Sequence, residues 1–174
     1  MNVILYMAIT VNGFIAKEDD DTSWVTETEW ASFSGMIRKN GNMIIGRRTY
    51  EVMLKNDEFN RSKLDKIKTV VVTDDVSLTV HNPEFIVTAK SPKTALNILR
   101  NQGFETIMVC GGGGLNASFM EENLIDELYL DVEPIVFGTG IRLFKEEDFE
   151  AKLKLVETKK LSANEMQLHY EVIK

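Results

Sequence analysis

The sequence has few of the residues that build metal centres or disulfides. It contains one cysteine, Cys110, and two histidines, His81 and His169, which are far apart along the chain. A single cysteine cannot form an internal disulfide, and these three residues do not provide the closely spaced ligands of a zinc site. We therefore predict no metal centre, and the lack of disulfides fits the reducing cytoplasm.

Long apolar runs and basic clusters are also missing. No segment reaches the roughly 18 apolar residues that span a bilayer, and Met1 is followed by Asn2 rather than by the basic segment of a signal peptide. The 20 Lys and Arg residues are outnumbered by 27 Asp and Glu residues, which gives a formal net charge of −7. Because nucleic-acid binding depends on clustered positive charge, we expect neither a membrane nor a nucleic-acid partner, and a small-molecule ligand is favoured.

Enough apolar residues are present for one domain, since 44% of the 174 residues are hydrophobic, and we expect residues 1–174 to form it. Runs typical of strands lie at 3–9, 42–46, 68–73, 84–88, 105–110, 126–137, 153–161 and 166–173, and helical spacing or helix end signals mark 26–39, 47–54, 91–102 and 116–123. The polar span from Leu54 to Lys66 is predicted to be a loop. Because early strands alternate with helices and the last two strands form a hairpin, we predict an α/β fold. Its sheet is mixed and mainly parallel, with an antiparallel C-terminal hairpin and helices on both faces.

Two turns that lead from a strand into a helix carry the strongest functional signal. One is IIGRRTYE (residues 44–51), and the other is the glycine run Gly111–Gly114. In an open α/β sheet such turns lie at the carboxyl ends of strands, where the helix N–H groups, arginines and bare glycine backbone bind phosphates. Two such sites suit a dinucleotide. The alternative is that the glycine run is only a tight turn and that the two arginines are solvated surface residues. Neither turn is a Rossmann fingerprint or a P-loop.

The order of several motifs resembles the dihydrofolate reductase-like superfamily. The motifs are MAITVNGFIA (7–16), IIGRRTYE (44–51), VVVTD (70–74), CGGGGLNASFMEENLIDELYL (110–130) and PIVFGTGIRLF (134–144). The likeness is greatest to the reductase domain at the C-terminus of bifunctional riboflavin-biosynthesis proteins, and it covers almost the whole chain. It implies the three-layer dihydrofolate reductase-like fold and NADPH as the cofactor.

The resemblance also implies roles for matching residues. Ala8 and Ile9 would contact the nicotinamide, and Thr73 would lie beside the adenine ribose. The turn Gly46, Arg47, Arg48 and Thr49 would hold the phosphates on the adenosine side, with an arginine at the 2′-phosphate. Gly111, Gly112, Gly113, Gly114 and Leu115 would hold the pyrophosphate, with one Gly-Gly peptide in the cis form.

Glu29 is the candidate proton donor. In dihydrofolate reductases the active-site acid follows a Trp on the first helix, and Trp24, Glu29 and Phe33 fall at similar spacing. The alternative is a capping box, in which the side chains of Thr26 and Glu29 each accept a hydrogen bond from the backbone N–H of the other.

Asp131 and Asn12 complete the predicted site. Asp131, in the strand at 126–137, is a second candidate acid; if both acids faced one pocket, their repulsion would raise one pKa. The alternative is an ordinary carboxylate on a strand face. Asn12 stands where the riboflavin-type pattern commonly has Asp, so we assign it to substrate binding, with a plain Asn-Gly turn as the alternative.

The leading hypothesis is thus an NADPH-dependent reductase of a heterocyclic small molecule, most like 5-amino-6-(5-phosphoribosylamino)uracil reductase. A dihydrofolate reductase or another small-molecule reductase is the first alternative, and a non-catalytic nucleotide-binding module is the second. The resemblance also implies a homodimer that pairs through its late strands. One cysteine cannot supply the zinc ligands of the deaminase domain that precedes the reductase in bifunctional proteins, so the chain is expected to stand alone.

Overall fold

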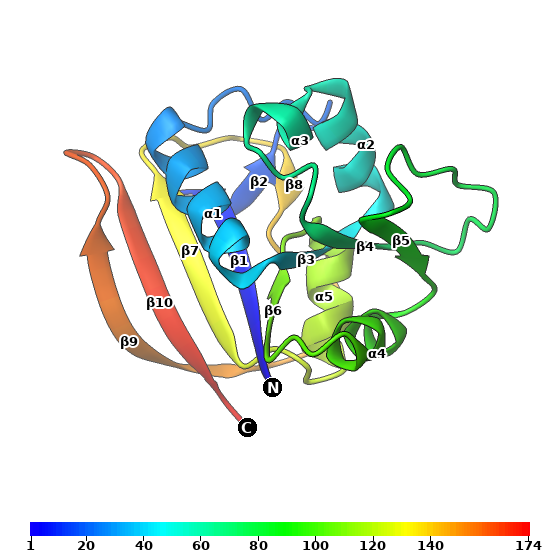
Figure 1. Cartoon of the computed structure of the whole chain (residues 1–174). Helices are drawn as coiled ribbons and strands as arrows, with labels where there is room; N and C mark the ends of the chain where they lie inside the picture. The colour runs from blue at the N-terminus through cyan, green and yellow to red at the C-terminus, as the bar shows by residue number, and fades with distance from the viewer.

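The computed structural model describes residues 1–174, and an eight-stranded sheet forms its centre (Figure 1). The strands are β1 (Asn2–Thr10), β2 (Phe14–Ala16), β3 (Asn42–Gly46), β4 (Lys68–Val72), β5 (Ile86–Ala89), β6 (Thr106–Val109), β7 (Glu127–Glu133), β8 (Ile141–Arg142), β9 (Lys152–Lys160) and β10 (Met166–Ile173). They follow the order β5-β4-β3-β6-β1-β7-β10-β9, while β2 and β8 form a separate small sheet.

The strand directions match the predicted architecture. The six strands from β5 to β7 in this order are all parallel to their neighbours. β10 runs antiparallel to both β7 and β9, and the two last strands form one edge of the molecule, at the left of Figure 1. The prediction of a mixed, mainly parallel sheet with an antiparallel C-terminal hairpin is therefore confirmed.

Five helices cover both faces of the sheet. They are α1 (Glu27–Asn40), α2 (Arg47–Lys55), α3 (Glu58–Arg61), α4 (Pro92–Asn101) and α5 (Gly113–Glu121). Successive residues of β1 point to opposite faces, so Val3 and Leu5 belong to one core cluster and Ile4 and Tyr6 to the other. Helices α4 and α5 contribute to the first cluster, and α1, α2 and α3 contribute to the second. Both faces of β1 are thus buried, as its unbroken apolar run predicts.

Residues that favour helix ends flank the long helices. The Thr26 hydroxyl accepts a hydrogen bond from the Glu29 N–H at 3.2 Å, and Gly41 ends α1 in the left-handed conformation with φ of 72°. Ser91 caps α4, with Pro92 at its first position. None of the five helices is both long and apolar enough to cross a bilayer.

Two predicted boundaries are wrong. The segment from Leu54 to Lys66 is not all loop, because α2 continues to Lys55 and α3 follows. A helix of four residues is too short for periodicity to reveal it, and α3 instead packs Phe59 against the core. Helix α5 begins at Gly113 rather than at Asn116, so half of the glycine run lies in its first turn.

Candidate functional site

A pocket of about 400 Å³ lies where the two predicted turns meet. Gly46 at the end of β3 donates its backbone N–H to the Gly111 oxygen at 2.7 Å, and the Cys110 N–H bonds to the Ile44 oxygen at 2.9 Å. The chain thus holds the Gly-Arg turn and the glycine run side by side. Twenty-four residues line the pocket, including the first-turn residues of α2 and α5.

The four glycines of the run differ in how strongly the surrounding chain constrains them. Gly111 has φ of +86°, and a Cβ there would lie 2.9 Å from the Met7 sulfur. A Cβ on Gly113 would lie 2.4 Å from the Arg142 backbone oxygen, and one on Gly112 would lie 3.3 Å from the Thr49 hydroxyl. A Cβ on Gly114 would meet nothing within 4 Å, although Gly114 lines the pocket. No packing within the chain requires a glycine at residue 114.

Both helices present uncapped N-termini to the pocket. Neither Gly46, before α2, nor Gly112, before α5, supplies a side-chain cap. The first N–H groups of a helix have no partner inside the helix, and together with the helix dipole they attract anions. The peptide between Gly111 and Gly112 is cis, as the resemblance implies. The bare backbone and the two helix starts are suited to phosphates.

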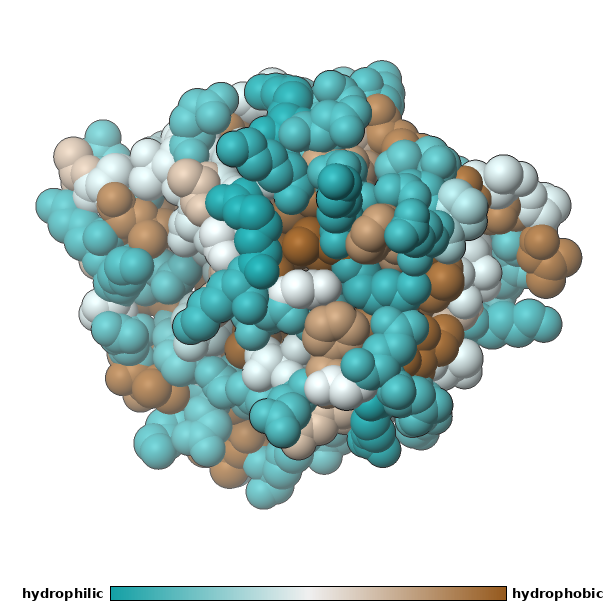
Figure 2. Space-filling view, in the orientation of Figure 1, coloured by the Kyte–Doolittle hydropathy of each residue, from teal (hydrophilic) through white to brown (hydrophobic).

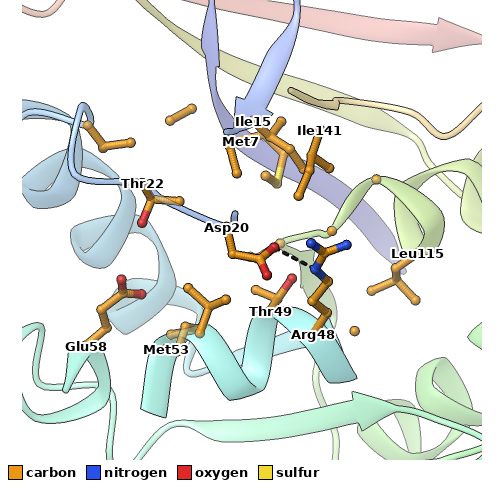
Figure 3. Close-up of a pocket in the computed structure, with 18 of the residues that line it drawn as sticks. Met7, Ile15, Asp20, Thr22, Arg48, Thr49, Met53, Glu58, Leu115 and Ile141 are labelled. Atoms are coloured by element: carbon orange, nitrogen blue, oxygen red, sulfur yellow. Dashed lines mark ion pairs between the residues drawn. The ribbon is translucent and has the colours of Figure 1, made fainter. Parts of the chain in front are cut away.

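The two predicted arginines line the pocket, and each forms an ion pair. Arg47 contacts Glu51 and Asp75, both at 2.8 Å. The Arg48 guanidinium contacts Asp20 at 2.6 Å, and the close-up shows this pair reaching across the pocket (Figure 3). Both arginine side chains are about half exposed or more, so a phosphate can reach their guanidinium groups. It would have to compete there with the carboxylates that already pair with them.

Glu29 lies in the wall of the pocket, and only half of the predicted capping box forms. The Glu29 N–H donates to Thr26, but the Thr26 N–H donates to Glu133 Oε1 at 3.1 Å instead of to Glu29. No group of the chain donates a hydrogen bond to the Glu29 carboxyl, although its residue is only 3% exposed. Burial raises the pKa of Glu29 well above its usual value, and the charges of Asp131, Glu133, Glu165 and Glu58 raise it further.

Asp131 does not line the pocket, so the two candidate acids do not share it. Its residue is 1% exposed and lies behind Tyr6, whose hydroxyl donates to Asp131 Oδ2 at 2.5 Å. Gln167 donates to the other carboxylate oxygen at 2.8 Å, and the Tyr6 hydroxyl also contacts Ser32 at 2.7 Å. Burial raises the pKa of Asp131, while these hydrogen bonds act in the opposite direction. Asp131 anchors Tyr6, and Tyr6 is the residue that reaches the pocket.

The remaining predicted residues are placed unevenly. Ala8, Thr49 and Leu115 line the pocket, whereas Ile9, Thr73 and Gly111 do not. Asn12 does not line it either: its amide donates to the Phe137 oxygen at 2.6 Å and its oxygen accepts from the Thr10 hydroxyl at 2.9 Å. Asn12 thus fastens the turn after β1 to the chain beyond β7, which is the structural alternative.

Several pocket residues escape sequence reasoning. The helical spacing of α1 predicts that Phe33 belongs to the core, yet Phe33 and its neighbour Trp30 both line the pocket. Glu58 lies on α3, in the span predicted to be a loop, and its residue is only 7% exposed. The surplus of aromatic residues at the start of α1 was the available signal for the first two, and none existed for Glu58.

The strand order, the helices on both faces and the pocket at the carboxyl ends of β3 and β6 define an α/β domain of the dihydrofolate reductase type. The family model for the RibD C-terminal domain matches residues 1–166, so the chain belongs to that reductase-like family. The resemblance to the riboflavin-type reductase domain is confirmed.

Relatives and solved structures agree with this assignment. The chain is 34% identical over 171 residues to YwjB, a protein of Bacillus subtilis (strain 168) that is described as uncharacterized; the match covers 96% of this chain and 95% of YwjB. A putative riboflavin biosynthesis protein from Shewanella sp. PV-4 has a TM-score of 0.81 at 21% identity, with both chains covered completely. A deaminase and 5-amino-6-(5-phosphoribosylamino)uracil reductase from Thermotoga maritima has a TM-score of 0.73 at 18% identity; the match covers 99% of this chain and 56% of that one.

Proposed function

We propose that the protein is an NADPH-dependent reductase of a heterocyclic small molecule, with a reaction most like that of 5-amino-6-(5-phosphoribosylamino)uracil reductase. One observation carries this proposal: a single pocket joins a glycine backbone and two uncapped helix N-termini to a buried carboxyl that has no partner. The glycine backbone and the helix N-termini suit the phosphates of a dinucleotide, and the buried carboxyl suits proton transfer. The reductase named in the Thermotoga protein supports the choice of reaction.

Most of the residues that the resemblance assigns to NADPH line the pocket. The exceptions are Ile9, Thr73 and Gly111, which lie within two residues in sequence of residues that line the pocket or form an ion pair with one of its arginines. Gly111–Leu115 would hold the pyrophosphate, and the open space beside Gly114 leaves room for its close approach. Gly46–Thr49 would hold the adenosine-side phosphates, with Arg47 or Arg48 at the 2′-phosphate. Thr73 precedes the Arg47 partner Asp75 by two residues, which is consistent with a place near the adenine ribose. Ala8 and Ile9 would meet the nicotinamide, and bound NADPH would supply a hydride to an electrophilic carbon of the substrate.

Glu29 would supply the proton. Because burial and neighbouring acids raise the pKa of Glu29, its carboxyl keeps its proton at a pH where an exposed glutamate is ionised. The carboxyl has no competing partner in the chain, so it is available to donate to a substrate heteroatom beside the carbon that accepts the hydride. The ionised Glu29 would then be destabilised by Glu58 and its other acidic neighbours, which favours its reprotonation through the pocket.

Cofactor binding and turnover test the proposal in sequence. NADPH at a hundred times its Kd should stabilise the protein by about 2.7 kcal/mol in a thermal-shift assay. NADPH oxidation is then measured with the aminouracil phosphate, with dihydrofolate and with small carbonyl compounds. We expect turnover with a heterocycle and a loss of about 100-fold or more in Glu29→Gln, typical of removing a general acid.

Glu27→Gln is the matched control, because Glu27 is an exposed acid two residues earlier on α1. Equal rates for Glu29→Gln and Glu27→Gln would remove Glu29 from the mechanism. NADPH binding without turnover of any compound would instead favour a nucleotide-binding module, and the absence of a thermal shift would overturn the proposal.

We also propose that the protein is a homodimer that pairs through β9 and β10. All nine residues of β9 are exposed, and the strand ends the sheet with one unpaired edge. The exposed large hydrophobic residues on this hairpin are Leu153, Leu155, Val156, Met166 and Ile173. Figure 2 shows hydrophobic patches among hydrophilic ones over the part of the molecule where these strands lie in Figure 1. A long edge strand with exposed apolar side chains favours pairing with another copy.

A further inference from the structure

The two ends of the pocket differ in charge and in chemistry. Arg47 and Arg48 are the only basic residues that line it, and both lie beside the glycine run. Two buried acids, Glu29 and Glu58, also line the pocket. They are close enough for the charge of Glu58 to raise the pKa of Glu29, and the charge of Glu29 in turn raises the pKa of Tyr6. In Figure 3, Arg48 and Leu115 lie on one side of the pocket, and Glu58 and Thr22 lie on the other. The arginines are assigned to the cofactor, so no cation lines the substrate end.

Glu58 is only partly satisfied by the chain. It lies at the start of α3, its residue is 7% exposed, and its Oε1 accepts one hydrogen bond, from the Asn56 amide at 3.1 Å. Two carboxylate oxygens together accept about four hydrogen bonds, so one donor leaves most of this capacity unused. Glu58 forms no salt bridge; burial raises its pKa, while the Asn56 hydrogen bond and the more distant charge of Arg61 act in the opposite direction. A ligand with its own N–H groups or a positive charge would supply the missing hydrogen bonds and so stabilise the buried carboxylate of Glu58.

The aromatic side chains favour a flat ligand. Trp30 and Phe33 meet edge to face with ring centroids 5.7 Å apart, and Tyr6 meets Phe33 in the same way at 5.6 Å. All three line the pocket. Because Asp131 and Ser32 hold the Tyr6 hydroxyl, the Tyr6 ring is fixed in position. Rigid aromatic faces of this kind stack well on a planar ring.

We propose that the substrate is a flat heterocycle without a phosphate group, carrying amino or amidine-type N–H donors, and that Glu58 is the residue that recognises them. A phosphate at this end would be desolvated beside two acids, with no cation in the pocket lining there to compensate it, which is strongly unfavourable. An amidine-type group would instead form paired hydrogen bonds with the free capacity of Glu58 and leave Glu29 for proton transfer. This inference rests on the proposed reductase function and narrows its substrate class.

Two ligand pairs test the inference by isothermal titration calorimetry. The first pair is 2,4-diaminopyrimidine and uracil, which have similar ring shapes but differ in amino groups. The second is 5-amino-6-ribosylaminouracil and its 5′-phosphate. We expect the diamino compound to bind at least tenfold more tightly than uracil, and the phosphate to weaken binding at least tenfold. Each titration is run with and without NADPH, so that a failure to bind NADPH overturns the reductase proposal while the ligand comparison remains readable.

Glu58→Gln should reduce the preference for 2,4-diaminopyrimidine over uracil at least fivefold and leave the Kd of NADPH within twofold. Asp57→Asn is the control, because Asp57 is the preceding acid, lies outside the pocket and has φ of 54°, which Asn also tolerates. It should retain the full preference. Tighter binding or faster reduction of the 5′-phosphate would overturn the inference and support the reductase function. If Glu58→Gln fails to fold, the two ligand pairs measured on the unmodified protein still test the predicted substrate class. If Glu58→Gln folds and keeps the wild-type preference for 2,4-diaminopyrimidine over uracil, Glu58 does not recognise the substrate.

Discussion

Gly114→Ala separates the cofactor-binding role of the glycine run from its packing role. A methyl group at residue 114 would meet no atom of the chain within 4 Å, and it would enter the space beside the uncapped start of α5. We therefore expect the fold to tolerate this change, since Gly→Ala in a helix alters stability by only about 1 kcal/mol or less. NADPH should not tolerate it, because its pyrophosphate needs the bare backbone there.

The expected size of the effect follows from mass action. If the methyl group weakens NADPH binding tenfold, the loss is about 1.4 kcal/mol. At an NADPH concentration of one hundred times the original Kd, the stabilisation then falls from about 2.7 to about 1.4 kcal/mol. For a chain of this length each kcal/mol shifts the melting temperature by about 2 to 4 °C, so the NADPH-induced shift should fall by about half.

Gly113→Ala is the matched comparison, one residue earlier in the same helix turn. Its methyl group would lie 2.4 Å from the Arg142 backbone oxygen, so the chain itself must move. Overpacking of this kind costs about 1 to 3 kcal/mol, which lowers the melting temperature without ligand by about 2 to 12 °C. The assay is thermal unfolding of both variants with and without NADPH. A full NADPH shift in Gly114→Ala, or an unchanged melting temperature in Gly113→Ala, would refute the reasoning.

Three further predictions follow from the site and from the sheet edge. Because the pKa of Glu29 is raised in the folded state, the stabilising contribution of its protonated carboxyl is present below the usual glutamate pKa and is lost as pH rises, by about 1.4 kcal/mol per unit of pKa shift. In urea unfolding from pH 5 to pH 8, the wild type should therefore lose stability relative to Glu29→Gln, and parallel stability curves for the two proteins would contradict this. Asp131→Asn removes a charge that raises the pKa of Glu29, so the pH above which kcat declines should move downward, and an unmoved profile would show that the two acids are not coupled. Leu155 is 52% exposed on β9, and Leu155→Glu should convert the proposed dimer to a monomer in light scattering at micromolar concentration, whereas a monomeric wild type would exclude the dimer.

Much of the fold could be predicted because its signals are local. The unbroken apolar run at 3–9 marks a strand buried on both faces, and Ser91-Pro92 marks the start of α4. The place of the pocket was also predictable, since ligands of open α/β sheets bind at the carboxyl ends of strands. Helix α3 was missed because its four residues are held by the packing of Phe59 rather than by a repeating pattern.

The catalytic half of the site depends on contacts between residues that are distant in sequence. The Thr26–Glu29 motif predicts a capping box, but the acceptor of the Thr26 N–H is Glu133, 107 residues later. Asp131 pairs in register with Ala8, and only the folded sheet shows that Tyr6 stands between Asp131 and the pocket. No local pattern contains such information, so sequence reasoning located the phosphate-binding turns better than it located the acids.

The contacts of Thr26 should make two residues outside the pocket sensitive to substitution. Glu133, at the end of β7, and Glu165, in the turn between β9 and β10, both accept hydrogen bonds from Thr26, although neither lines the pocket. Their side chains hold the start of the helix that carries Glu29. Substitutions at Glu133 and Glu165 should therefore score with the pocket residues. In a mutational scan, a hydrogen bond to Thr26 would predict the effect of substituting Glu133 or Glu165 on activity better than the distance of these residues from the ligand would.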